Sequence, residues 1–256
     1  MPITAIFLDD GGVLNDNARR ALQWRRWLGE FLPRHLGGRA QDWSEANLEV
    51  AARLFDGTFL QRHFGARRED VSFLEWERAY ALEWLGGMCE RMGRPLPDEA
   101  DRIALMREAH RFVTGRVRAG IPGAAQTLRA LHARGYRLYT ASYGPRYDLE
   151  GHVATLGAGI RELFTELYGA DLVNLLKESA EYYRRVFAHA GEDPAEALVL
   201  DDSPDNVRRA EAAGARAVLV APVPVVGVRH RVAALTELPA LLQAWEAGAE
   251  KGRGLG

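Results

Sequence analysis

The stretch Ile3-Thr4-Ala5-Ile6-Phe7-Leu8-Asp9-Asp10-Gly11-Gly12 decides the fold. Its apolar half is short and continuous, and it stops abruptly at two carboxylates and two glycines. This pattern is typical of a buried strand that ends at a polar turn. We therefore take residues 3–8 as the first strand of a sheet.

Beyond about residue 119, helices and strands are predicted to alternate. The predicted helices cover residues 124–133, 145–156, 178–190, 204–213 and 238–247, and the predicted strands cover residues 136–141, 167–168, 197–200 and 216–220. Such an order implies a parallel sheet with helices on both faces. Residues 1–14 and 119–247 are thus expected to form an α/β core with a Rossmann-like parallel sheet.

The segment between these two pieces has a different character. Apolar residues recur there at helical spacing, as in Phe73, Trp76, Tyr80 and Trp84, and no convincing strand interrupts them. We expect an all-helical cap over residues 15–118, inserted after the first strand and large enough to be a domain. Residues 248–256 are expected to form a flexible tail.

Composition excludes several classes of protein. The chain of 256 residues has 33 basic and 35 acidic side chains, a net charge of -2, which disfavours a nucleic-acid binder. Cys89 is the single cysteine, so an internal disulfide is impossible and a reducing compartment fits. The start does not resemble a signal peptide, and the longest apolar run, residues 217–228, is too short to span a bilayer. We expect a cytoplasmic monomer or homodimer that binds neither nucleic acid nor membrane.

Four polar groups follow the predicted strands or precede their helices: residues 9–12, Ser142, Lys177 and residues 201–206. Ligands of open parallel sheets collect at the carboxyl ends of the strands. Carboxylates gathered there repel one another unless a cation lies among them, and oxygen ligands without cysteine suit Mg²⁺. Lys177 and Ser142 offer the charge and the donor that a transferring phosphoryl group requires. A carboxylate beside the metal can act as nucleophile through an aspartyl-phosphate.

The order of these groups resembles the four motifs of the haloacid dehalogenase (HAD) superfamily, whose members are mostly magnesium-dependent phosphatases with an aspartate nucleophile. The resemblance lies in Ile6 to Leu14 for the first motif, Gly135 to Ser142 for the second, Lys177 for the third and Leu198 to Asn206 for the fourth. It covers the whole core, and the insert is similar to the helical C1-type cap of many members.

The resemblance implies a role for each matching position. Asp9 would be the nucleophile, and Asp9 and Asp202 would hold magnesium with the backbone carbonyl of Gly11. Asp201 would bind the metal directly or support its ligands. Ser142 and Lys177 would hold the phosphate, and Asn206 would position the lysine or the metal's waters. The other candidates for contact with the phosphate or the substrate are Gly11, Gly12, Tyr143 and Asn206, and Lys177 and Ser142 are counted with Asp9 as catalytic.

Three positions depart from the family pattern. Phosphatases of the family usually carry a second aspartate two residues after the nucleophile, as general acid and base, and this chain has Gly11 there. Asp10 is one residue off, and it should point away from Asp9 because side chains alternate along an extended strand. Tyr143 stands where asparagine is common, and the usual proline after Lys177 is missing.

The first hypothesis is therefore a phosphohydrolase that acts on a small phosphorylated metabolite. A 2-haloacid dehalogenase without metal, a binding or regulatory module disabled at Gly11, and a phosphotransferase remain as alternatives. A phosphonate-cleaving relative that uses a cap lysine is excluded, because residues 15–118 contain no lysine.

Several other features are interpreted as structural. The tryptophans of Trp24-Arg25-Arg26-Trp27 are expected in the core of the cap with the arginines outside. The arginine pairs at 19–20 and 67–68 are expected to be solvated, with a cap arginine facing an anionic substrate as the alternative. The histidines lack ligand spacing. Cys89 is expected to be buried as a small hydrophobe.

Overall fold

The structure, a computed structural model, describes residues 2–253, and it describes side chains for residues 2–247. Its centre is a six-stranded sheet in the order β3-β2-β1-β4-β5-β6, in which all neighbouring strands are parallel. The strands are β1 (Ala5–Leu8), β2 (Arg137–Ala141), β3 (Phe164–Tyr168), β4 (Ala197–Asp201), β5 (Arg216–Val220) and β6 (Arg231–Val232). The predicted α/β fold class is confirmed.

Strand β1 lies in the middle of the sheet and is buried on both faces. Ile6 and Leu8 point into one apolar cluster, and Ala5 and Phe7 point into the other, as the two-residue period of a strand requires. Complete burial of side chains such as Ile6, Leu8 and Phe7 stabilises the fold by about 1.5–3 kcal/mol each. The apolar run at the start of the chain therefore forms the central strand of the core and contributes to both of its apolar clusters.

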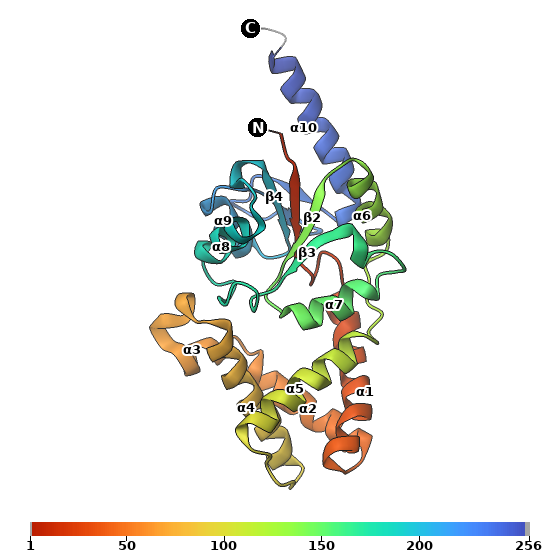
Figure 1. Ribbon diagram of the computed structural model, residues 1–256, viewed down its shortest axis with the longest axis vertical. Helices are drawn as coiled ribbons and strands as arrows, with labels where there is room; N and C mark the ends of the chain where they lie inside the picture. Colours follow the sequence, from red (N-terminus) through yellow and green to blue (C-terminus); the bar gives the residue numbers. More distant parts are fainter. Residues whose placement is uncertain (1, 254–256) are drawn as a thin grey trace.

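Helices cover both faces of the sheet, as Figure 1 shows. The helices α6 (Ala124–Ala133), α7 (Arg146–Ala154) and α10 (Leu238–Arg253) pack on the face of Ile6 and Leu8, and α8 (Ala180–Ala190) and α9 (Pro204–Ala212) pack on the face of Phe7. Short 3-10 turns complete the core at η2 (Arg161–Leu163), η3 (Pro194–Glu196) and η4 (Leu235–Glu237).

A second, all-helical layer lies beyond the carboxyl ends of the strands (Figure 1). It consists of α1 (Asn17–Leu36), α2 (Ala40–Leu54), α3 (Phe59–Phe64), η1 (Gly65–Asp70), α4 (Phe73–Arg91) and α5 (Glu99–Thr114). Asp16 caps α1 by accepting hydrogen bonds from the backbone of Ala18 and Arg19, and Ser72 with Glu75 forms a capping box at α4. Buried tryptophans such as Trp43 and Trp84 hold the layer together. We call this layer the cap.

Two chain segments connect the core to the cap, and they are hydrogen-bonded to each other. The backbone N–H of Asp16 donates to Ala119 O at 2.8 Å, and that of Ile121 donates to Leu14 O at 2.9 Å. Asn15 and Gly120 form an antiparallel bridge between them. The two crossings therefore make one short ribbon.

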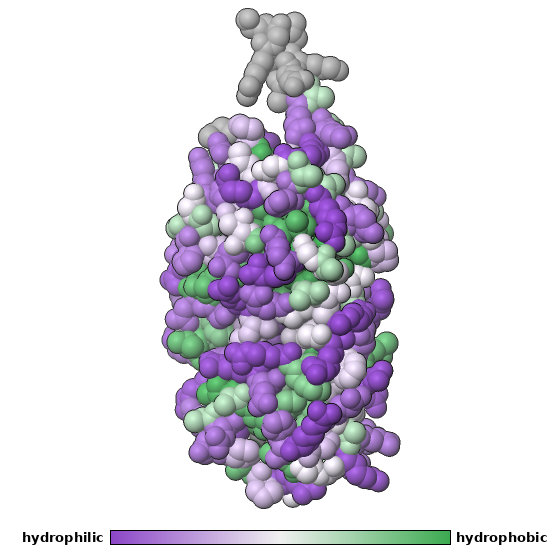
Figure 2. Space-filling model, turned by 45° about the vertical axis from the view of Figure 1, so that its right-hand side comes forward, coloured by the Kyte–Doolittle hydropathy of each residue, from purple (hydrophilic) through white to green (hydrophobic). Residues whose placement is uncertain are grey.

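The surface carries polar residues over both layers, with smaller apolar patches between them (Figure 2). Large exposed apolar side chains such as Leu22, Phe55 and Val226 belong to elements far apart in the chain, as is normal for a protein surface. No helix among residues 2–253 is both long and apolar enough to cross a membrane.

Two elements differ from the sequence predictions. Residues 231–232 form the edge strand β6, which is too short to leave a periodic signal in the sequence. Helix α10 continues through Arg253 and so includes part of the segment predicted as a tail. Residues 254–256 of that segment lie outside the described residues.

Candidate active site

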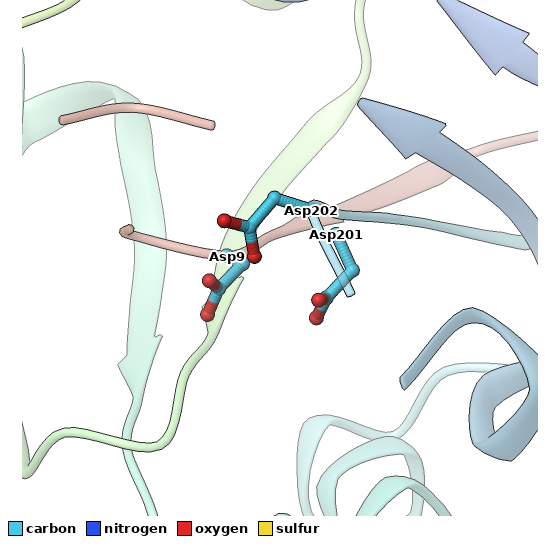
Figure 3. A group of neighbouring side chains, drawn as sticks. All are labelled: Asp9, Asp201 and Asp202. Atoms are coloured by element: carbon cyan, nitrogen blue, oxygen red, sulfur yellow. The ribbon is translucent and has the colours of Figure 1, made fainter. Parts of the chain in front are cut away.

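Three carboxylates meet where β1 and β4 end. The two strands are paired with Leu8 opposite Leu200, so Asp9 and Asp201 emerge side by side, followed by Asp202. Asp9, Asp201 and Asp202 each offer one oxygen, and these oxygens lie within 4.8 Å of one another (Figure 3). Hard carboxylate oxygens at this spacing fit Mg²⁺. The candidate metal ligands are thus brought together.

Lys177 lies in the loop between β3 and α8 and places its ammonium among these carboxylates. Its Nζ is 3.0 Å from Asp9 Oδ1 and 2.5 Å from Asp201 Oδ2, and it donates to Ala141 O at 2.5 Å. Only 1% of the side chain is exposed. Burial alone would lower the pKa of Lys177, but the charges of Asp201 and Asp9 hold it well above its ordinary value. The lysine therefore carries a buried positive charge beside the candidate nucleophile.

The environment of Asp9 suits a reactive carboxylate. Burial raises the pKa of Asp9 to about 7, and Lys177 opposes this shift while Asp201 adds to it. A cation bound beside Asp9 would lower that pKa again. The side chain remains 13% exposed, so it can be reached from the cap side of the sheet.

Asp201 is fully buried, and its two oxygens serve different partners. Oδ1 accepts hydrogen bonds from the backbone N–H of Ser203 at 2.9 Å and from Asn206 Nδ2 at 3.1 Å, while Oδ2 faces Lys177. Asn206 in turn accepts from Arg209 Nη1 at 2.9 Å. These contacts orient the carboxylate that holds the lysine.

Ser142 and Tyr143 follow β2 at the same edge of the sheet. Ser142 is buried, and its carbonyl accepts a hydrogen bond from Tyr182 at 3.0 Å. The ring of Tyr143 packs edge-on against Trp76 of α4, with centroids 5.7 Å apart. Ser142 therefore lies in the core site, whereas Tyr143 lies where the core meets the cap.

Gly12 makes room for a candidate metal ligand. Its φ is +72°, and a Cβ at this position would lie 2.1 Å from Asp202 Oδ2. Glycine is thus required twice over, by the backbone conformation and by the approach of Asp202. The loop after β1 and the carboxylate after β4 fit one another only because this side chain is absent.

Asp10 points away from Asp9, as strand alternation requires, into a buried network. Its Oδ1 accepts from Asn15 Nδ2 at 2.7 Å, and its Oδ2 lies 2.5 Å from Arg20 Nη1 and 2.9 Å from His152 Nδ1. Burial alone would raise the pKa of Asp10, but His152, Arg20 and Asn15 hold it well below its usual range. Asp10 is therefore an anchor, held in its charged form by its partners, for the loop that carries Asp9.

Sequence reasoning missed Arg20 and Arg209. The prediction of a solvated pair at 19–20 is wrong for Arg20, whose side chain is 23% exposed and bound to Asp10. Arg209 donates to the backbone carbonyl of Lys177 at 2.9 Å and pairs with Glu178 at 3.0 Å. The spacing of Arg20 three residues after Asn17 was a signal only for the contact between these two side chains, and the sequence held no signal for the contact of Arg20 with Asp10.

Two cavities of the cap lie away from this chemistry. A cavity of about 710 Å³ lies within the cap, beside Arg53, Gly87 and Arg102, and a second of about 590 Å³ adjoins it at Arg78 and Glu83. Neither includes Asp9 or Lys177 among its lining residues. We place the candidate active site at Asp9 and Lys177, because a reaction needs charged groups in contact with the substrate and a cavity alone does not supply them.

Fold and site together define an α/β enzyme with an acidic centre and a buried lysine beneath a helical cap. A family model, described as haloacid dehalogenase-like hydrolase, matches residues 3–214. The chain belongs to this family and is a hydrolase. The resemblance expected from the four motifs is thereby confirmed.

A curated protein is similar to part of the chain. The chain is 30% identical over 104 residues to a bifunctional riboflavin kinase/FMN phosphatase of Arabidopsis thaliana, a match that covers 41% of this chain and 27% of that protein. The chain thus spans about a quarter of the length of this curated relative.

Solved structures with the same fold include a 2-haloacid dehalogenase from Pseudomonas syringae pv. Tomato DC3000 (18% identity, 95% of this chain and 99% of that chain, TM-score 0.64). A second is the HAD-hydrolase YfnB from Bacillus subtilis bound to magnesium (17% identity, 94% and 99%, TM-score 0.61). A third is the L-2-haloacid dehalogenase from Xanthobacter autotrophicus (20% identity, 94% and 98%, TM-score 0.57). At these identities the likeness concerns the fold.

Proposed function

We propose that the protein is a magnesium-dependent phosphohydrolase that acts on a small phosphorylated metabolite through an aspartyl-phosphate on Asp9. The observation that carries the proposal is the charge of the site. Asp9, Asp201 and Asp202 lie within 4.8 Å, and Lys177 is the cation in contact with Asp9 and Asp201. An anionic substrate would be repelled by this excess of negative charge unless a further cation were bound.

Each residue has a task in the proposed reaction. A bound Mg²⁺, held by Asp9, Asp202 and the carbonyl of Gly11, would supply positive charge to the phosphoryl oxygens. Lys177 keeps Asp9 oriented and adds a second positive charge. Asp9 attacks phosphorus as the bond from phosphorus to the leaving oxygen breaks and the leaving group departs toward the cap; water then attacks phosphorus, the bond to Asp9 breaks, and phosphate is released. The cap over the carboxyl ends of the strands excludes bulk water and limits the substrate to a small molecule.

The remaining expectations accompany this proposal. Ser142, Gly12 and Asn206 would contribute to holding the phosphoryl group or its surroundings, and Tyr143 would contact the rest of the substrate at the cap. We propose a cytoplasmic monomer or homodimer with no nucleic-acid or membrane partner.

A 2-haloacid dehalogenase is the second candidate, because Gly11 removes the acid and base that phosphate esters need. Asp201 and Asp202 beside Asp9 disfavour it, since an anionic haloacid would meet uncompensated carboxylates.

The test is phosphate release from a panel of phosphorylated metabolites, with magnesium and with chelator, alongside halide release from 2-haloacids. Phosphate release that needs both magnesium and Asp9, shown by its loss in Asp9→Asn, supports the proposal. Halide release that is independent of metal, without phosphate release, would establish the second candidate instead.

Magnesium binding is measured separately by calorimetry, which needs no turnover. Asp202→Asn should weaken binding, whereas Asp205→Asn is the matched control, because Asp205 is exposed and paired with Arg208 outside the site. Equal affinity in Asp202→Asn and wild type would remove the metal from the proposal.

A further inference from the structure

The space next to Gly11 is filled by two side chains of the first cap helix. A Cβ on Gly11 would lie 2.6 Å from Asn17 Oδ1 and 3.0 Å from Arg20 Nη2. A side chain at position 11 would therefore run into this pair. Arg20 and Asn17 thus occupy the space that a side chain at position 11 would need, and position 11 lies two residues after Asp9.

Arg20 is fixed in this place. Its Nη1 lies 2.5 Å from Asp10 Oδ2, and its Nη2 donates to Asn17 Oδ1 at 2.5 Å. Asp10 is itself held by His152 and Asn15, so the guanidinium is anchored to the core although it belongs to the cap.

Arg20 and Asn17 can donate hydrogen bonds to a leaving group but cannot transfer a proton to it. A guanidinium keeps its protons at any pH at which proteins work, and a carboxamide does not titrate, so neither group can protonate a leaving group. Both donate hydrogen bonds, and Arg20 also carries a charge that stabilises an anion. Asp10 does not replace them, because its oxygens face Asn15, Arg20 and His152 and not the site. The cap side of the site thus favours a departing anion and offers no proton from these groups.

We infer that the substrates are acyl phosphates or phosphoanhydrides, whose leaving group departs as a stable anion, and that Arg20 binds this anion. The inference rests on the proposed function. In the first step, an oxygen of Asp9 bonds to phosphorus, and the bond to the leaving oxygen breaks with its electron pair remaining on the carboxylate or phosphate. In the second step, water attacks phosphorus and the bond to Asp9 breaks. One water proton stays on the new phosphate, and the other goes to a phosphate oxygen or to solvent.

The test compares leaving groups of increasing basicity on the full-length protein with magnesium. Acetyl phosphate, phenyl phosphate and a simple alkyl phosphate release groups with pKa values of about 4, about 10 and about 16, by analogy with carboxylic acids, tyrosine and water. General acid catalysis contributes at least about 100-fold, so we expect kcat/KM for acetyl phosphate to exceed that for the alkyl ester by at least about that factor. Equal values for the three compounds would overturn the inference, because they would reveal a proton donor.

A second measurement addresses Arg20 itself. Arg20→Gln should lower kcat/KM for acetyl phosphate by about 100-fold, the usual effect of removing a donor to a developing anion. Its matched control is Arg19→Gln, because Arg19 is exposed and its side chain makes a long contact of 3.4 Å with Gly120 O, away from Asp10. An unchanged rate in Arg20→Gln would overturn the role of Arg20. If that variant does not fold, the wild-type series with the three leaving groups still decides the substrate class.

The failure of the proposed function would look different. No magnesium-dependent phosphate release from any of the three compounds, in folded protein, would overturn the phosphohydrolase and the inference with it. Release at similar rates from all three would leave the phosphohydrolase standing and overturn the inference alone. Trapping of phosphorylated Asp9, detected by intact mass, reports the first step independently of turnover.

Discussion

Replacement of Asp10 by asparagine tests whether the second carboxylate of the first motif is an anchor or a catalyst. The carboxylate is 3% exposed and has three partners, Asn15, Arg20 and His152. Hydrogen bonds to a charged group contribute about 1.5–3 kcal/mol and neutral ones about 0.5–1.5 kcal/mol, so the loss of charge costs about 1 kcal/mol per bond. The expected decrease in the free energy of unfolding is about 3 kcal/mol, and Tm should fall by about 6–12 °C for a chain of this size.

The assay is denaturant unfolding with chelator present, so that metal binding does not contribute. Asp205→Asn is the control and should stay within about 0.5 kcal/mol of wild type, because Asp205 is exposed. A value for Asp10→Asn within the same range would refute the anchor and leave Asp10 free for a catalytic role.

The pH dependence of the same difference provides a second check. The pKa of Asp10 is held well below its usual range in the folded protein, so its contribution is fully present above the unfolded pKa of about 3.9. It is lost as the pH falls through the folded pKa. The difference between wild type and Asp10→Asn should therefore shrink as the pH falls below about 4. A difference that grew over that range would contradict the sign.

Three further outcomes are expected. Lys177→Met should abolish turnover and lower the free energy of unfolding by about 3–5 kcal/mol, because it leaves the buried charge of Asp201 without its ion-pair partner. Calorimetric unfolding in the presence of chelator measures this loss, and a variant as stable as wild type would contradict the prediction. Gly12→Ala should weaken magnesium binding by at least about 10-fold in titration calorimetry, because its Cβ meets Asp202. Gly135→Ala has a similar positive φ with open space around it and should bind magnesium like wild type. Tyr147→Phe removes a 3.1 Å hydrogen bond from the core to the buried Glu77 carboxylate of the cap, which is paired with Arg107, and should cost about 1.5–3 kcal/mol in urea unfolding; an unchanged stability would contradict this.

Sequence patterns predicted the parts of the fold that depend on local order. The apolar run before Asp9 and the one that ends at Leu200 were each predicted to be a strand followed by acidic residues. Because the two strands are parallel and adjacent, their carboxyl ends bring Asp9 close to Asp201. The direction of Asp10 followed from the two-residue period of a strand. Lys177 stood out because lysine is rare in this chain.

Contacts across the chain could not be predicted in the same way. His152 meets Asp10 from 142 residues away, and Arg209 holds the backbone of Lys177 from 32 residues away. No periodicity records such a meeting, because it depends on how α7 and α9 pack on the sheet. Arg20 looked like half of a solvated pair, since its partner Asp10 lies outside the helix pattern that suggested this interpretation.

The paired ribbon between core and cap limits how the two layers can move. Two separate linkers would leave the cap free to swing in several directions, but backbone hydrogen bonds from Asp16 to Ala119 and from Ile121 to Leu14 make the two strands bend together. Asn15 of this ribbon also donates to Asp10, next to the proposed nucleophile Asp9. Any bending of the ribbon is therefore mechanically linked to the loop of Asp9, so the cap and this carboxylate share one hinge.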